Sequence, residues 1–240
     1  MKGASGPMYP RGDRPVPEVE LGFVHRYIIP AEKGSGVTLL LLHGTGGNEN
    51  DLLSVGAALA SKTGMLSPRG KVLENGMPRF FRRIALGVFD QEDLKLRTRE
   101  LAEFVEAASR AYGFDQNAVV AVGYSNGANI AGSLMLRRPD LLAAAALLRP
   151  MVPFVPEEPP DLSGKSVFLS AARHDPIVTP EETMRVERLF RECGAEVFLQ
   201  WQPHGHEMRQ EELPAVRGWL AGWMGRTAHN LRQGPHPWAR

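Results

Sequence analysis

Residues 118–134, AVVAVGYSNGANIAGSL, decide the fold class, because an apolar run passes through Gly-Tyr-Ser-Asn-Gly into apolar residues at helical spacing. A strand that turns into a helix at Gly-x-Ser-x-Gly forms a nucleophile elbow, which strains the serine backbone and projects its hydroxyl above the sheet edge. Side chains at Gly123 and Gly127 would collide where the helix folds back on its strand. The alternative is a chance match, but the flanking strand and helix patterns are the context that the motif requires. We therefore predict that Ser125 is a nucleophile.

Strand and helix patterns alternate along the rest of the chain. The apolar runs expected as strands are 23–29, 37–42, 84–88, 118–122, 143–148, 166–171 and 196–200. Helical patterns occupy about 49–62, 97–112, 126–138, 180–193 and 209–224. Several strands are almost continuously apolar, which is typical of strands covered on both faces. The order predicts an α/β fold with a mostly parallel central sheet flanked by helices.

A single domain accounts for this pattern. We expect it to cover residues 21–225, with tails at 1–20 and 226–240. The proline-rich stretch 149–165 lies between two expected strands and is predicted to be a loop. It is too short for a helical cap, so we expect no cap domain and a fairly open pocket.

The composition excludes several classes of partner. Lys and Arg number 28 against 27 Asp and Glu, and the basic residues are scattered, which argues against nucleic acid. No apolar run approaches the ~18 residues of a membrane span, and the first 20 residues do not form a signal peptide. The one cysteine, Cys193, rules out an internal disulfide framework and fits a reducing compartment, so we expect a cytoplasmic protein.

A serine nucleophile needs a histidine to accept its proton and a carboxylate to orient that histidine. In folds built around such an elbow, the chain order is serine, then Asp or Glu, then histidine. Asp175 follows the expected strand 166–171, at the end where parallel sheets present their chemistry. It could instead be an ordinary turn residue before Pro176. We predict that Asp175 is the orienting carboxylate.

Two histidines follow the last expected strand. His206 comes after the flexible Gly205 and just before the last helix, whereas His204 lacks that placement, so we predict that His206 is the base. His204, His206 and Glu207 could also bind a metal, but no H-E-x-x-H motif or cysteine pair supports this interpretation. We expect no metal and no cofactor.

Acyl transfer also requires N–H donors for the negative oxygen of its transition state. The backbone N–H of Asn126, after the nucleophile, is one candidate. The second is Thr45, in the glycine-rich loop HGTGG (43–47) that follows an apolar strand. A phosphate cradle is the alternative for this loop, but the phosphate-binding glycine motifs are absent. His43 precedes the nucleophile in the chain and is expected to organise the loop.

Apolar residues near these segments are candidates for the substrate pocket. The charged loop 89–94 (FDQEDL) could border an acyl pocket with Phe89 and Leu94 turned inward, or it could be the solvated start of a helix. Met151, Val152 and Ile177 are further candidates, although such residues often serve in plain packing.

Five segments in order, HGTGGNENDL, GYSNGANIA, LRPMVP, HDPIV and GHEM, resemble the phospholipase/carboxylesterase family of α/β-hydrolases, which includes the acyl-protein thioesterases. GYSNGANIA and LRPMVP, with FFRRIALGVFDQEDL, look most like a bacterial carboxylesterase branch linked to quinone or aromatic stress. The resemblance covers about residues 21–224 and implies an α/β-hydrolase fold without metal, often dimeric. It also implies the triad Ser125, Asp175 and His206, with Thr45 and Asn126 as the oxyanion hole.

The expected function is a serine carboxylesterase that hydrolyses small to medium apolar acyl esters through an acyl-enzyme. Asn126 stands where the thioesterases usually have glutamine, which argues against lipidated-protein substrates. An acyl thioesterase or lysophospholipase-type hydrolase is the alternative within the enzymes. From a different class, the fold could serve as a non-catalytic binding protein. A small-molecule ester is the expected partner, and a homodimer is possible.

Overall fold

The computed structural model describes residues 14–15, 20–29 and 34–233, and the side chains among them up to residue 227, except those of 14–15. Its central sheet has eight strands in the order β1-β2-β4-β3-β9-β10-β11-β12. Their bounds are β1 Arg14–Pro15, β2 His25–Ile29, β3 Thr38–Leu42, β4 Gly64–Pro68, β9 Val119–Tyr124, β10 Ala144–Leu148, β11 Ser166–Ala172 and β12 Glu196–Gln202. In this order the neighbours from β4 to β12 pair in parallel, whereas the pairs β1–β2 and β2–β4 are antiparallel. The predicted parallel sheet is confirmed.

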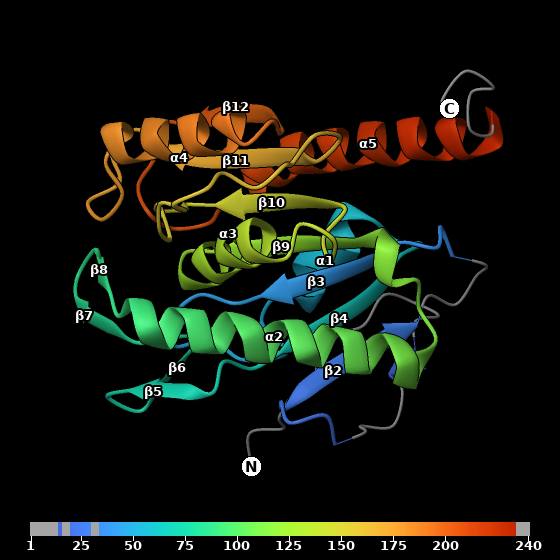
Figure 1. Cartoon of the computed structure of the whole chain (residues 1–240), viewed down its shortest axis with the longest axis horizontal. Coiled ribbons are helices and arrows are strands. Elements are labelled where there is room, and N and C mark those ends of the chain that lie inside the picture. The colour runs from blue at the N-terminus through green and yellow to red at the C-terminus, as the bar shows by residue number, and fades with distance from the viewer. Residues whose placement is uncertain (1–13, 16–19, 30–33, 234–240) are drawn as a thin grey trace, which may run out of the picture.

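Helices cover both faces of this sheet (Figure 1). They are α1 Leu53–Leu59, α2 Gln91–Tyr112, α3 Asn126–Arg137, α4 Pro180–Glu192 and α5 Leu213–Gln233, with short 3₁₀ turns at Gln116–Ala118 and Gln210–Glu212. Apolar residues of α2, α3 and α4 form one core with the sheet, and those of α1 and α5 form the other. The fold is therefore that of an α/β-hydrolase.

The strands form because their apolar runs serve both cores at once. In β3, Leu40 and Leu42 belong to the core under α2 and α3, whereas Leu39 and Leu41 belong to the core under α1 and α5. Successive side chains of a strand point to opposite faces, so a fully buried strand must be apolar at every position. This explains why the sequence of β3 shows no alternation.

The predicted core strand at 84–88 is wrong. These residues form an exposed hairpin of β7 Arg83–Ala85 and β8 Val88–Phe89, outside the main sheet. Ile84 is 76% exposed and Leu86 61% exposed, so the apolar run faces outward. The strand that joins the main sheet between β3 and β9 along the chain is instead β4, whose sequence GMLSP carries little strand signal although all five residues are buried. A second small hairpin joins β5 Val72–Glu74 to β6 Met77–Arg79.

Three helices differ in length from their patterns. α2 begins at Gln91 because the Asp90 side chain accepts the backbone N–H of Asp93 at 3.0 Å and caps the helix, so most of the charged loop 89–94 is its first turn. α1 covers only the middle of the predicted range 49–62. α5 continues to Gln233, past the domain boundary predicted at residue 225. Of the predicted tails, residues 1–13, 16–19 and 234–240 lie outside the described part of the chain.

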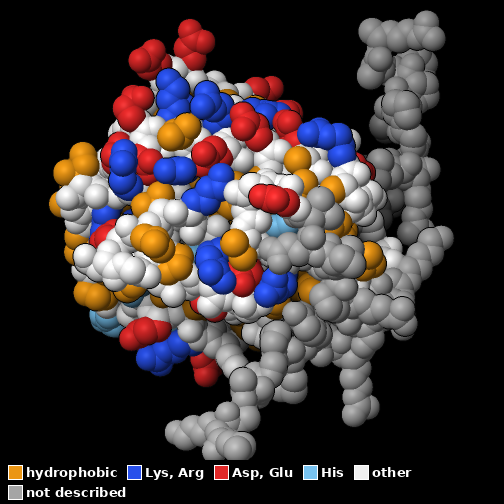
Figure 2. All heavy atoms as spheres, turned by 90° about the horizontal axis from the view of Figure 1, so that it is seen from below, with side chains coloured by type: hydrophobic (Ala, Val, Ile, Leu, Met, Phe, Trp, Pro, Cys, Tyr) orange, Lys and Arg blue, Asp and Glu red, His pale blue; other side chains and the backbone are white. Residues whose placement is uncertain are grey.

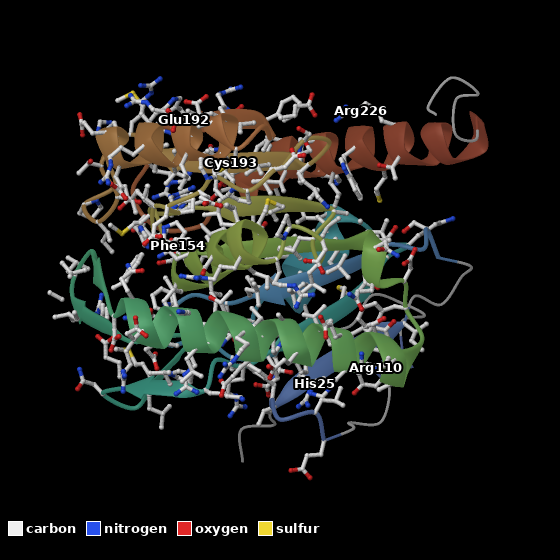
Figure 3. All side chains as sticks on the ribbon, in the orientation of Figure 1. His25, Arg110, Phe154, Glu192, Cys193 and Arg226 are labelled. Atoms are coloured by element: carbon white, nitrogen blue, oxygen red, sulfur yellow. The ribbon has the colours of Figure 1, made fainter. Side chains whose placement is uncertain are left out.

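The segment 149–165 crosses from β10 to β11 as a loop without a helix, as its prolines predict. Charged side chains of both signs are interspersed on the face shown in Figure 2. None of the described helices is both long enough and apolar enough to cross a membrane. Cys193, labelled in Figure 3, follows the end of α4 and is 4% exposed in the core.

Candidate active site

The elbow lies between β9, which ends at Tyr124, and α3, which begins at Asn126. Ser125 has φ 53° and ψ −114°, a strained conformation for a residue with a side chain. A Cβ at Gly123 would lie 2.5 Å from the carbonyl oxygen of Gly127, and a Cβ at Gly127 would overlap the carbonyl of Leu42. The two glycines therefore let the helix return over its strand, as the sequence predicts.

Asp175 and His206 lie in the loops that follow β11 and β12, at the edge of the sheet where Ser125 stands. His206 Nε2 is 2.9 Å from the Ser125 hydroxyl oxygen, and His206 Nδ1 is 2.8 Å from Asp175 Oδ2. The other oxygen of Asp175 accepts the backbone N–H groups of Ile177 and Val178, at 2.8 and 3.0 Å. These contacts hold the carboxylate in place, so the imidazole lies between an acid and a hydroxyl.

The backbone on both sides of the His206 ring is anchored by two further side chains. Tyr124 donates its hydroxyl to the carbonyl of His206 at 3.1 Å. Arg149 donates Nε to the carbonyl of Gly205 at 3.3 Å and Nη2 to that of Glu207 at 3.2 Å. Three consecutive carbonyls are thereby fixed, and with them the position of the imidazole.

Arg149 is itself 1% exposed and forms an ion pair with Glu212. Its Nη1 and Nη2 lie 3.0 and 3.1 Å from the two carboxylate oxygens of Glu212, which is fully buried. The Ser170 hydroxyl donates to the same carboxylate at 2.5 Å. Sequence reasoning missed this pair, because Arg149 sits in a proline-rich loop and Glu212 in a charged turn before α5. Neither position carries a pattern that indicates burial.

The loop 43–47 brings Thr45 to the same site. The N–H groups of Thr45 and Asn126 donate to no described backbone or side-chain acceptor, and both residues border the cavity at Ser125. Asn126 is the first residue of α3, where N–H groups lack partners within the helix. The two donors are therefore available to a bound oxygen.

His43 organises the loop, as expected. Its Nδ1–H donates to the carbonyl of Gly44 at 2.7 Å, and its Nε2 accepts the N–H of Gly70 at 2.9 Å. An accepting Nε2 requires the neutral ring. Burial of the ring, which is 2% exposed, lowers the pKa of His43 and stabilises that neutral form.

A cavity of about 200 Å³ opens beside Ser125. Phe89, Met151 and Ile177, three of the candidate pocket residues, border it. Leu94 does not: it is fully buried in the core, because the helix that begins at Gln91 turns it toward the sheet. Val152 lies elsewhere too, packed against the other core residues with its N–H on Glu182.

Sequence reasoning also missed six cavity residues. Tyr124 and Asn129 flank the elbow, and the other four, Arg79, Arg83, Leu86 and Gly87, come from β6 and the β7–β8 hairpin. Figure 1 shows both hairpins at the end of the molecule toward which β3 and β10 point. The apolar run 84–88 is the signal that could have located them, had it been interpreted as a pocket wall and not as a core strand. The hairpin encloses one side of the site that we expected to be open.

Two neighbouring features lie apart from this arrangement. The second histidine of the loop, His204, contacts the carbonyl of Gly205 at 3.4 Å with Nδ1, and its Nε2 is buried without a partner. A larger hollow of about 450 Å³ lies between α2 and α3, lined by charges of both signs, and holds none of the residues around Ser125. Ser125 and His206 border the smaller cavity.

Known proteins of similar sequence and structure share this arrangement of elements. The family described as phospholipase/carboxylesterase matches residues 24–224. The putative hydrolase MhqD of Bacillus subtilis (strain 168) is 50% identical over 189 residues, covering 78% of this chain and 94% of the relative. The Bacillus cereus carboxylesterase structure is 44% identical, with a TM-score of 0.83, over 85% of this chain and 96% of its own. A carboxylesterase from Mesorhizobium loti is 32% identical, with a TM-score of 0.80, over 88% and 100%.

The match covers the elbow, both later loops and the glycine-rich loop, at an identity well above what fold alone would give. The chain belongs to the phospholipase/carboxylesterase family of α/β-hydrolases.

Proposed function

We propose that the protein is a serine carboxylesterase that hydrolyses small to medium apolar acyl esters. The observation that carries this proposal is the pair of hydrogen bonds from His206, at 2.9 Å to Ser125 and 2.8 Å to Asp175. Hydroxyl, imidazole and carboxylate in that order form the proton path that acyl transfer by serine requires. The cavity of about 200 Å³ favours a small acyl group, since drug-sized ligands occupy roughly 300–1,000 Å³.

The first half of the reaction forms the acyl-enzyme. Ser125 Oγ bonds to the ester carbonyl carbon while His206 Nε2 takes the hydroxyl proton. The carbonyl oxygen becomes negative and accepts the N–H groups of Thr45 and Asn126. The bond to the alcohol oxygen then breaks, and the alcohol leaves with the proton from His206.

The second half repeats these steps with water. His206 takes a proton from water as the water oxygen bonds to the acyl carbon, and Ser125 leaves with that proton. Asp175 stays ionised throughout, because its work is to hold Nδ1–H and to stabilise the transient imidazolium.

A panel of 4-nitrophenyl esters of increasing chain length, with matched thioesters, tests the proposal. We expect the short esters to be preferred, and Ser125→Ala to lower kcat by roughly 10⁴ to 10⁶ with the fold retained. Near-normal turnover by the folded variant would refute the serine mechanism. Preference for the sulfur ester of each pair would make the protein an acyl thioesterase.

The two histidines of the loop give a matched comparison. His206→Ala should abolish ester hydrolysis, whereas His204→Ala should retain most of it, because only His206 contacts Ser125 and Asp175. The opposite result would reverse the assignment. If a fluorophosphonate fails to label Ser125 in the folded protein, a non-catalytic binding role gains support. The cytoplasmic location and the homodimer stay predictions.

A further inference from the structure

Two arginines border the cavity at Ser125, although nothing in ester hydrolysis requires them. Arg79 is the last residue of β6 and is 3% exposed, and Arg83 is the first of β7 and is 29% exposed. Both line the same wall as Leu86 and Gly87. Acidic side chains are absent from the described lining of this cavity.

Each guanidinium has donors to spare. Arg79 donates Nε to the carbonyl of Phe81 at 3.2 Å and Nη1 to Glu74 at 2.5 Å. Arg83 directs Nε and Nη2 to the other oxygen of Glu74, at 3.0 and 2.6 Å. Arg79 Nη2 and Arg83 Nη1 have no acceptor among the described residues. The Glu74 contacts tie the two hairpins together, but they do not use the donors that remain.

The charges around this corner do not balance. Two guanidinium groups share one carboxylate, that of Glu74, and Arg79 is almost wholly out of water. Glu74 can neutralise only one of the two positive charges, so one further anion would balance the cluster. The Arg–Glu contacts also lower the pKa of Glu74, which keeps that carboxylate ionised.

The corner is rigid as well as basic. A Cβ added at Gly70 would overlap the backbone carbonyl of Arg79, so the two backbones pack closely. Nearby, the Asn126 side chain accepts the N–H of Phe80 with Oδ1 at 2.8 Å, and its Nδ2 is buried without a partner. Arg79, Arg83 and Asn126, each with a nitrogen that has no partner among the described residues, thus border the same small cavity. Preorganised guanidinium donors of this kind suit a carboxylate.

We propose that Arg79 and Arg83 bind a carboxylate of the substrate, so that the preferred esters are small, singly charged half-esters or hydroxy-acid esters. This inference rests on the proposed esterase function and changes its substrate class from wholly apolar esters to small esters that carry one carboxylate. Because the cavity is only about 200 Å³, the charged group must lie a few bonds from the carbonyl that Ser125 attacks. It could belong to the acyl part or to the alcohol part, and the experiment separates the two.

Two pairs of substrates test the proposal. 4-Nitrophenyl hemisuccinate replaces the terminal methyl of 4-nitrophenyl butanoate by a carboxylate and places the charge on the acyl part. 4-Carboxyphenyl acetate and phenyl acetate place it on the alcohol part. The quantity measured is the ratio of kcat/KM for the charged and the neutral member, compared between wild type and variants so that intrinsic reactivity cancels.

Three variants should change this ratio of kcat/KM values in different ways. Arg83→Gln should lower the ratio about tenfold or more for one pair, as expected for a lost charge-assisted hydrogen bond. Glu74→Gln should raise it, because both arginines are then uncompensated, and it carries the test if Arg83→Gln does not fold. Arg82→Gln is the matched control: it removes the same charge one residue away, from an arginine that is 61% exposed and faces Asp90. Its ratio should equal that of wild type.

A change in the hemisuccinate pair assigns the carboxylate to the acyl part, and a change in the carboxyphenyl pair assigns it to the alcohol part. Unchanged ratios in Arg83→Gln and Glu74→Gln, with neutral esters still hydrolysed, would overturn the inference and leave the proposed esterase function intact.

Succinate binding, measured by calorimetry, gives a second test that does not depend on catalysis. We expect Arg83→Gln to weaken it about tenfold and Arg82→Gln to leave it unchanged, and equal affinities in all three proteins would count against the site.

Discussion

Arg149 positions the loop that carries His206 through hydrogen bonds to the backbone carbonyls on either side of it. Its backbone has φ 58°, unusual for a residue with a long side chain, and this turn directs the guanidinium beneath the His206 loop. Glu212 neutralises it from the other side. Burying this ion pair costs desolvation free energy. The hydrogen bonds that Arg149 donates to the carbonyls of Gly205 and Glu207 fix the position of His206 between them.

We predict that Arg149→Lys lowers kcat by tenfold or more with a smaller change in KM. A lysine keeps the charge but cannot reach both carbonyls and both carboxylate oxygens at once. Arg149→Met should in addition lower the free energy of unfolding by about 3–5 kcal/mol, because Glu212 is left buried and unpaired. Steady-state kinetics and urea unfolding measure the two effects, with the surface change Arg185→Lys as control. If Arg149→Lys lowers the free energy of unfolding but leaves kcat unchanged in the folded protein, the role of Arg149 is purely structural.

His43 predicts a dependence of stability on pH. Its pKa is lowered in the folded protein by burial, so the unfolded chain binds a proton at a higher pH than the native chain does. Stability should therefore be highest above the ordinary histidine pKa, ~6.5, and fall as the pH drops below it. His43→Gln should reduce the difference between urea midpoints at pH 7.5 and 5.5. His174→Gln, which changes an exposed histidine, should leave that difference as in wild type; the idea fails if both variants behave alike.

At the scale of elements, α3 has two glycines with opposite packing. A Cβ at Gly127 would strike the backbone carbonyls of Leu42 and His43 and push the helix away from β3. At Gly132, in the same helix, the nearest atoms are Phe190 at 3.5 Å and Pro153 at 3.7 Å, an ordinary contact distance. The close approach that makes the elbow is therefore confined to its first turn.

Gly127→Ala should accordingly destabilise the protein and abolish activity, since the N–H of Asn126 moves with the helix. Gly132→Ala should instead raise the free energy of unfolding by up to about 1 kcal/mol, because alanine is the better helix former where space permits. Thermal unfolding and ester hydrolysis of both variants check this contrast. A destabilised Gly132→Ala would mean that Phe190 or Pro153 does not yield.

The elements that the sequence predicted correctly are those whose own residues carry the strand or helix pattern. β3, β9, β10 and β11 are continuous apolar runs, and α2 and α4 have one apolar face each, so local chemistry suffices for them. The sequence analysis missed the strand β4 and predicted a sheet strand at the hairpin β7–β8 for a different reason. GMLSP is a strand because β2 and β3 pair with it, and 83–89 lies outside the main sheet, where part of it borders the cavity. Only the assembled chain contains either cause.

The same distinction applies to the site. The elbow serine, Asp175, His206 and the Thr45 loop follow strands, and parallel strands bring their carboxyl ends to one edge, so their meeting follows from the order along the chain. Arg149 and Glu212 are 63 positions apart, and only tertiary packing brings them together. Arg79 and Arg83 meet Glu74 locally, across two short hairpins, but no sequence motif indicates that this cluster borders the cavity.

At the scale of the whole molecule, the buried Cys193 provides a reporter of opening. Burial raises the pKa of its thiol and keeps it from reagents, and the chain contains one cysteine. A chromogenic disulfide should therefore label the native protein slowly, with a rate that follows the unfolding transition in urea. Glu192→Cys in a Cys193→Ser background, one residue away, should react at once; rapid labelling of the native wild type would contradict the buried position. A single absorbance trace would then time the separation of α4 from the sheet.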